Sequence, residues 1–334
     1  MATPESQTEH QPRDTIFRNY SSQQASNYAE GRLGYSEALI EFILKQHNSS
    51  GGHNGVVLDV GCGPGLATRM LAPHFDIAYG ADPGNSMIEK AQQIGGTSKA
   101  GSPIVYKLSN AEDLDKIDGL DHSSVDLITA ATAAHWFEMP KFWKAAAKIL
   151  KPGGTVAIWT VFRQHDTSGD NKVEALIEDF RENVLRPYNS AGSQLTHDGY
   201  ANLVMPWDDQ TTASLYDREL SSRHELSSKD GYLPRTYMMD SKPGDASLDE
   251  TLQKFRKMLN SFGTVNRWQE ANPDLVGTKD DIIEIFMRKL RQAAEDNGGS
   301  LDVSSLAERF AIAVIIVKKI DDIEKSISSN FTEE

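Results

Sequence analysis

A glycine-rich turn within residues 56–65 constrains this chain more than any other feature of its sequence. The segment reads VVLDVGCGPG, so a short β-prone run ends in three glycines within five positions. Gly61, Gly63 and Gly65 permit positive φ angles and place no Cβ beside the backbone. The turn stands between a predicted strand and a predicted helix, where backbone amides receive ligands. We therefore expect a ligand to lie directly against this backbone.

Short apolar strands alternate with helical segments over residues 56–160. The sequence predicts strands at 56–60, 77–82, 104–109, 125–131 and 155–160. It predicts helices near 66–73, 85–94 and 138–150. This alternation is typical of an open, doubly wound parallel sheet, which binds its ligands at the carboxyl ends of its strands.

The remaining sequence predicts a cap and two further strands. An amphipathic helix is expected at 171–185, and two more at 248–262 and 279–296. Strands near 213–221 and 309–318 are expected to complete the sheet as an antiparallel pair. The predicted fold is α/β: a doubly wound, Rossmann-like sheet of seven mostly parallel strands with a helical cap insertion.

The predicted organisation has four parts. Residues 1–30 are expected to form a flexible lead, which orders only where something docks it, and 31–160 a ligand-binding core. Residues 161–308 contribute one strand and the substrate cap, and 309–334 the final strand and a tail.

Composition limits the kinds of molecule that the chain is expected to bind. The chain has 334 residues with 34 basic and 48 acidic side chains, a net charge of -14, which disfavours nucleic acid. One cysteine, Cys62, excludes an internal disulfide, and no apolar run approaches the roughly 20 residues that cross a membrane. We expect a cytoplasmic protein with a small-molecule substrate, no membrane or metal, and a monomeric state, with a homodimer as the alternative.

The spacing around the turn predicts a nucleoside ligand without phosphates. The dinucleotide pattern needs a third glycine where Leu66 stands, and Pro64 removes a backbone amide that a pyrophosphate would use. Asp82 ends the second predicted strand, where a carboxylate accepts hydrogen bonds from both ribose hydroxyls. A nicotinamide oxidoreductase is therefore disfavoured.

These segments together resemble a known family. VVLDVGCGPGLAT, GADPGNSMIEKAQ, LSNAEDL, VDLITAATAAHWFE and ILKPGGTVAIW are similar in order and spacing to the motifs of class I S-adenosylmethionine-dependent methyltransferases. AHWF, NYAEGRLGY and FRKMLNSFGTVNRWQE resemble fungal trans-aconitate methyltransferases and their small-molecule relatives. That group usually has Arg-Pro-x-Tyr-Pro where this chain reads RLGYS at 32–36, so both prolines are missing.

The resemblance implies S-adenosylmethionine as cofactor and S-adenosylhomocysteine as product. Its methionine portion would be held by Asp59 and by the backbone of a loop, which comprises Gly61, Cys62, Gly63 and Gly65. Asp82 would hold the ribose. Residues around the adenine would be Pro83, Met87, Asn110, Ala111 and Glu112. The small side chains of Ala130 and Ala131 would face the sulfonium. We assign no chemistry to the thiol of Cys62.

Candidate substrate residues each have two interpretations. His135 and Trp136 follow the fourth strand and serve either as a base and a wall or as a packed pair that braces the loop. Tyr28, Arg32 and Tyr35 either close over the site or lie on the surface of an entry helix. Three arginines of the cap either hold an anionic substrate or are solvated charges: Arg163, Arg235 and Arg267.

The predicted activity is methyl transfer to a carboxylate oxygen of an organic acid or related metabolite. Such an acceptor is ionised near neutral pH and needs no base. The alternatives are a phenol, amine or carbon acid with His135 as base, and a protein that binds the cofactor without transferring a methyl group.

Overall fold

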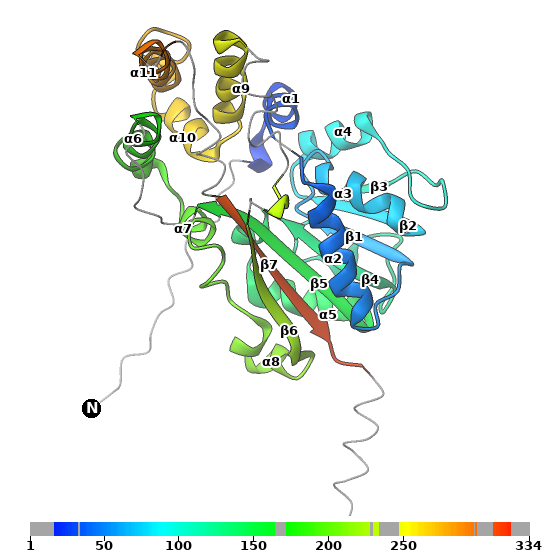
Figure 1. Ribbon diagram of the computed structural model, residues 1–334. Helices are drawn as coiled ribbons and strands as arrows, with labels where there is room; N and C mark the ends of the chain where they lie inside the picture. Colours follow the sequence, from blue (N-terminus) through cyan, green and yellow to red (C-terminus); the bar gives the residue numbers. More distant parts are fainter. Residues whose placement is uncertain are drawn as a thin grey trace, which may run out of the picture.

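The structure is a computed structural model that describes residues 17–32, 34–163, 172–227, 230–233, 247–296, 298 and 310–321. Its centre is a seven-stranded sheet of order β3-β2-β1-β4-β5-β7-β6 (Figure 1). The strands are β1 (Val56–Val60), β2 (Ile77–Asp82), β3 (Val105–Leu108), β4 (Val125–Ala131), β5 (Leu150–Arg163), β6 (Tyr216–Ser227) and β7 (Phe310–Lys319). The predicted α/β fold class is confirmed.

The sheet reverses its strand order between β1 and β4. β1 pairs in parallel with β2 on one side and with β4 on the other, and β5 continues the parallel set. β7 runs antiparallel between β5 and β6, with Thr155 opposite Lys318 and Arg163 opposite Phe310. The reversal opens a crevice at the carboxyl ends of β1 and β4, where sheets of this kind bind ligands.

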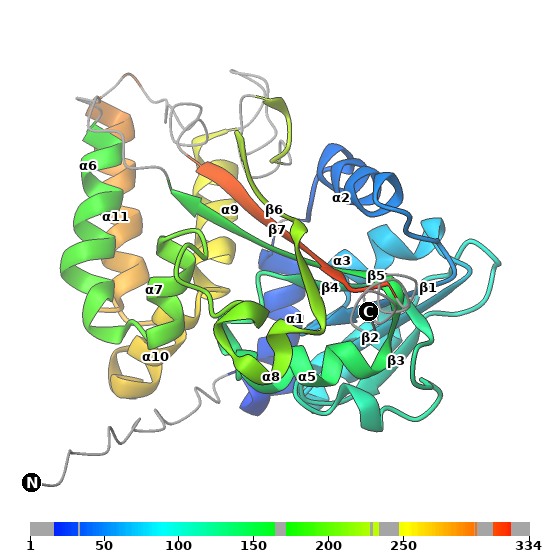
Figure 2. The same ribbon diagram turned by 90° about the horizontal axis from the view of Figure 1, so that it is seen from below.

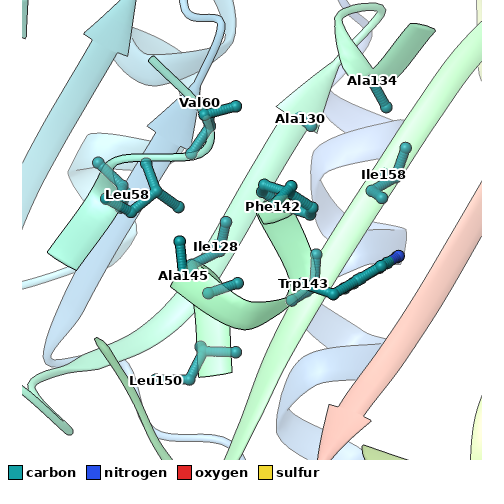
Figure 3. Close-up of a cluster of buried hydrophobic side chains, with 14 of the residues drawn as sticks. Leu58, Val60, Ile128, Ala130, Ala134, Phe142, Trp143, Ala145, Leu150 and Ile158 are labelled. Carbon is teal, nitrogen blue, oxygen red and sulfur yellow. The ribbon is translucent and has the colours of Figure 1, made fainter. Parts of the chain in front are cut away.

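Two buried clusters cover the two faces of the sheet. On one face, α5 (Met139–Ile149) places Phe142 and Trp143 against Leu58 and Ile128 (Figure 3). The short helix α8 (Gln210–Ala213) lies on the same side as α5 (Figure 2). The other face is covered by α2 (Glu37–Ser49), α3 (Leu66–Leu71) and α4 (Asn85–Ile94). Helices on both sides therefore bury the apolar strands.

Local sequence explains where α2 begins and which face it buries. The Ser36 hydroxyl accepts a hydrogen bond from the Leu39 amide, which satisfies one free N–H of the first turn. Leu39, Ile40 and Ile43 recur at helical spacing and are buried.

The cap helices lie above the end of β5 (Figure 1). They are α6 (Lys172–Asp179), α7 (Ala191–His197), α9 (Leu248–Asn260), α10 (Gly263–Ala271) and α11 (Ile282–Asp296). Residues of α6, α9, α10 and α11 form a third buried cluster. α6 and α11 lie side by side (Figure 2). No helix in the described ranges is long and apolar enough to cross a membrane.

The segment predicted as a flexible lead contains an ordered helix. α1 (Ser22–Gly31) begins at a capping box in which Ser21 and Gln24 exchange hydrogen bonds. It contacts α9 of the cap and α4 of the core, and Ser86 donates a hydrogen bond to the Tyr20 carbonyl. α1 therefore bridges the two halves, and residues 1–16 lie outside the described part.

Other boundaries also differ from the sequence prediction. β5 extends from Leu150 to Arg163, because its antiparallel partner β7 keeps pairing past the predicted end at 160. β6 begins at Tyr216 and not at 213, since α8 occupies the preceding residues. The predicted helix 171–185 continues after Asp179 as a π-helical turn, Phe180–Leu185.

We expect Trp143→Ala to lower the free energy of unfolding by about 3–5 kcal/mol, because it leaves a cavity and removes a buried indole. Trp143 is fully buried, and its Nε1 donates to the Val204 carbonyl at 2.9 Å. Urea denaturation measures the change. The matched control is Lys144→Ala on the exposed side of α5, which should stay within about 0.5 kcal/mol of wild type. Equal losses in both variants would contradict this packing.

Candidate functional site

The loop after β1 is held close to its neighbours by backbone contacts. Gly61, Gly63 and Gly65 have φ angles of 66°, 53° and 81°. The Cys62 amide donates to the Ala81 carbonyl at 3.0 Å, which joins this loop to the end of β2. A Cβ at Gly65 would lie 2.5 Å from Tyr106 Oη, whereas at Gly63 the nearest atom would be Tyr28 Cε1 at 3.8 Å. The open side of the loop is therefore at Gly63.

Asp82 joins the loop after β1 to the loop after β2. Its Oδ2 accepts a hydrogen bond from the Gly63 amide at 2.9 Å, and its Oδ1 accepts one from the Gly84 amide at 2.8 Å. Burial raises the pKa of the Asp82 carboxyl to about 6, and the two amides and Arg18 oppose that rise. At neutral pH the carboxylate is ionised and keeps acceptor capacity on both oxygens.

Asp59 connects the elements around the site through buried hydrogen bonds. It is fully buried and accepts hydrogen bonds from the hydroxyls of Thr68 at 2.6 Å and Thr129 at 2.8 Å. Burial raises its pKa to about 6. The carboxyl therefore ties β1 to α3 and β4, and it does not line the cavity described next.

A cavity of about 850 Å³ begins at this loop and continues under the cap. The predicted site residues that line it are Tyr28, Arg32, Tyr35, Gly61, Cys62, Gly63, Asp82, Pro83, Met87, Ala111, Glu112, Ala131, His135, Trp136, Arg163 and Arg267. The predicted residues that do not line it are Asp59, Gly65, Asn110 and Ala130. Arg235 lies outside the described residues.

Two predicted residues have side chains engaged away from a ligand. Asn110, expected at the adenine, donates from Nδ2 to Asp113 at 2.9 Å, while the adjacent Ala111 and Glu112 line the cavity. The thiol of Cys62 is buried, and burial raises its pKa well above the usual value.

The described residues hold no group of three or more side chains suited to a metal ion.

The end of β4 is strained where it meets the cavity. Thr132 has a φ of 52°, an outlier for a β-branched residue, and its amide donates to the Trp159 carbonyl at 2.7 Å. Such strain is concentrated at functional sites. Thr132 lines the cavity beside Ala131 and was not predicted as a site residue.

His135 is fixed as a neutral side chain on the turn that follows. Its Nδ1 shares a hydrogen bond of 2.8 Å with Tyr200 Oη, and its ring lies 4.6 Å from that of Trp136. Burial, together with the positive charges of Arg32 and Arg267, lowers the pKa of His135 to about 3. The buried Tyr200 has a φ of 61° and was not predicted as a site residue.

The candidate arginines differ in the groups that they contact. Arg163 forms ion pairs with Glu174 at 2.6 Å and with Glu178, so cap carboxylates already engage it. Arg267 donates from Nε to the Tyr188 carbonyl at 2.6 Å, and Arg32 lies over the rings of Tyr28 and Phe262.

Tyr35, the last predicted substrate residue, packs edge-on against Trp159 at 5.5 Å between ring centroids. Its neighbour in the wall, Tyr28, packs against Tyr20 at 6.4 Å, also edge-on. Both rings line the cavity, so the entry segment and α1 form one of its sides.

Comparison with known proteins agrees with this geometry. Residues 58–158 match the family described as "Methyltransferase domain". CRG1 of Saccharomyces cerevisiae, described as a probable S-adenosylmethionine-dependent methyltransferase, is 26% identical over 83% of this chain and 89% of its own. Methyltransferase ptaI of Pestalotiopsis fici is 29% identical over 44% of each chain.

The fold has a solved counterpart. A protein from Anaeromyxobacter dehalogenans, described as a "Putative Type II Methyltransferase", superposes with a TM-score of 0.51. The superposition covers 87% of this chain and 97% of that one at 21% sequence identity. This likeness concerns the fold alone.

We expect Gly65→Ala to destabilise the protein by about 2–4 kcal/mol, because the substitution adds a steric clash to the cost of a left-handed φ. The new Cβ would meet Tyr106 Oη at 2.5 Å and Arg69 Nη1 at 2.9 Å. Gly51→Ala is the matched control, because Gly51 has the same φ of 81° with no atom near the new Cβ. It should lose only about 1–2 kcal/mol in urea denaturation. Indistinguishable variants would show that the loop has room to move.

Proposed function

We propose that the chain is a class I S-adenosylmethionine-dependent methyltransferase that methylates a carboxylate oxygen of a small organic acid, and the match of residues 58–158 to the family described as "Methyltransferase domain" supports this. The observation that carries the choice of acceptor is the hydrogen bond of 2.8 Å between His135 Nδ1 and Tyr200 Oη, which engages one ring nitrogen, on a ring where the charges of Arg32 and Arg267 act.

The loop and the end of β2 fit S-adenosylmethionine. Gly63 presents open backbone to the cavity, and both oxygens of Asp82 retain lone pairs for the two ribose hydroxyls. Pro83 and Met87 line the cavity beside it and would contact the adenine. When bound, the cofactor supplies a methyl group already activated on a sulfonium sulfur.

The surroundings of His135 favour an acceptor that needs no base. A side chain with a pKa of about 3 is a poor proton acceptor near pH 7. A carboxylate has a pKa near 4 and arrives ionised. Arg32 and Arg267, which both act electrostatically on His135, would attract it to the end of β4.

The remaining task of these residues is alignment and the exclusion of water. A carboxylate oxygen would contribute the lone pair of the new O–C bond, the S–C bond would break with its electrons left on sulfur, and no proton would move. Holding donor and acceptor about 3 Å apart supplies much of the rate gain. Since esterification removes the charge of the methylated carboxylate, the arginines would hold the product less tightly than the acid.

We propose a division of labour in which residues 31–160 bind the cofactor and residues 161–308 select the acceptor. The cavity is lined from both parts, which supports this division. A cytoplasmic location and a monomeric state remain predictions from composition.

Asp82→Asn is expected to weaken binding of S-adenosylhomocysteine about tenfold to a hundredfold, because the amide has one acceptor oxygen instead of two. The wild-type affinity should also depend on pH. A carboxyl whose pKa is raised to about 6 takes up a proton below that pH, whereas the ribose hydroxyls favour the ionised form. Affinity is therefore full above pH 6 and falls as the pH decreases.

Calorimetric titration between pH 5 and pH 8 measures both effects. In Asp82→Asn the decline below pH 6 should be largely absent, since the titrating group is gone. The control is Asp118→Asn, whose carboxylate is almost fully exposed and pairs with Lys107 on the surface. Wild-type affinity in Asp82→Asn at pH 7 would remove the proposed ribose contact.

His135→Gln is expected to retain methyl transfer to organic acids within about tenfold of wild type, whereas loss of a general base costs about 10²–10⁴-fold. The rate should stay level from pH 6 to pH 8. An assay of radiolabelled methyl transfer to acids, phenols and amines tests this, with His224→Gln on β6 as the control. Activity confined to phenols or amines, and abolished by His135→Gln, would make His135 the base.

A further inference from the structure

The cap end of the cavity forms a chamber that the cofactor does not explain. Its walls come from the π-helical turn, α7, α9, α10 and α11. Its apolar lining comprises Ile177, Phe180, Leu185, Phe255, Met258, Leu259, Phe262 and Phe286. These side chains belong to the cap and not to the loop that follows β1.

A stacked aromatic pair forms the far wall of this chamber. The rings of Phe180 and Phe286 lie 4.3 Å apart at an angle of 19°. Phe180 opens the π-helical turn that interrupts the end of α6, and Leu185 closes it. Such turns occur frequently at functional sites, where they redirect side chains. Here the turn brings Phe180, Arg181, Glu182 and Leu185 to the cavity.

Charge is distributed unevenly between the two ends of the chamber. At the end near β4, Arg32 and Arg267 both lower the pKa of His135, so their positive charges act at one place. At the cap end, Arg181 forms ion pairs with Glu178 at 3.0 Å and with Glu182 at 3.1 Å. Arg181 is therefore paired with carboxylates of its own helical segment, and the positive charges that act on His135 lie at the end near β4.

The lining of the cavity provides for more than a nucleoside cofactor. Residues of the loop after β1 and of the end of β2 line one part of it, whereas apolar residues of the cap line another and form a separate set of walls. The whole cavity measures about 850 Å³. A small tricarboxylate would leave the apolar walls uncovered and would bring extra carboxylates against them, which is costly without partners.

We propose that the chamber binds a monocarboxylic acid with an extended aliphatic or aromatic body, whose carboxylate lies near Arg267 and whose body packs against Phe180 and Phe286. This inference rests on the proposed carboxylate methylation and specifies its substrate class. The methyl group leaves sulfur for a carboxylate oxygen, the S–C electron pair stays on sulfur, and the product is a neutral methyl ester.

A homologous series of acids tests the substrate class. The full chain is assayed with S-adenosylmethionine and straight-chain monocarboxylic acids of increasing length, phenyl-substituted acids, and trans-aconitate. We expect kcat/KM to rise about tenfold or more for every two methylenes added, until the chamber is filled, because each buried methylene contributes to discrimination. Trans-aconitate should be the poorest acid of the set.

A variant that fills the chamber supplies the second readout. Met258 is a half-buried residue of α9 that lines the chamber, and Gln253 is an exposed residue of the same helix outside it. Met258→Trp should lower kcat/KM for the longest acids at least tenfold and leave that for the shortest acids and the affinity for S-adenosylhomocysteine unchanged. Gln253→Trp, the control, should match wild type for every acid.

The outcomes separate the two proposals. Methylation of short and long acids with equal efficiency, unaffected by Met258→Trp, would overturn the chamber assignment and leave carboxylate methylation intact. A preference for trans-aconitate would also overturn it. If S-adenosylhomocysteine binds but no acid of any length is methylated, the proposed function itself fails, and the chamber assignment fails with it.

Discussion

The buried carboxylate of Asp82 is the interaction on which the site depends. Its two oxygens accept the amides of Gly63 and Gly84, so one side chain fixes the loops after β1 and β2 relative to each other. Removing a carboxylate from water is costly, and these amides offset only part of that cost, which is why its pKa is raised to about 6. The lone pairs that remain face the cavity. We propose that these lone pairs accept hydrogen bonds from a ligand with two adjacent hydroxyls.

Rigidity and selectivity reside in different parts of the molecule. The core places its ligand-facing backbone with buried hydrogen bonds, such as those of Asp59 to Thr68 and Thr129. The cap instead builds a separate hydrophobic cluster, joined to the core through α1 and through the cavity walls. The strained backbone of Thr132 and the hydrogen bond between His135 and Tyr200 lie where the two parts meet. We infer that the core sets the chemistry and the cap sets the acceptor.

The sequence predicted the elements whose burial is continuous and missed those that depend on distant partners. β1, β2 and β4 have the predicted bounds, because short apolar runs flanked by Gly and Asp mark strands that are mostly buried. β6 was misplaced because it is an edge strand with a polar, exposed pattern. Arg163 was predicted as an anion clamp, and its ion pair with Glu174 could not be predicted because folding brings the two residues together. The positive φ of Tyr200 has no local signal, and the trans-aconitate resemblance leaves the acceptor open.

The central claim is that a phosphate-free adenosine compound lies on the loop after β1, and competitive calorimetry tests it most directly. The wild-type chain is titrated with S-adenosylhomocysteine and with NAD⁺ at pH 7.5, each alone and then in the presence of the other. The account predicts saturable, one-to-one binding of S-adenosylhomocysteine that NAD⁺ neither reproduces nor displaces. Saturable binding of NAD⁺ with no heat from S-adenosylhomocysteine would contradict it.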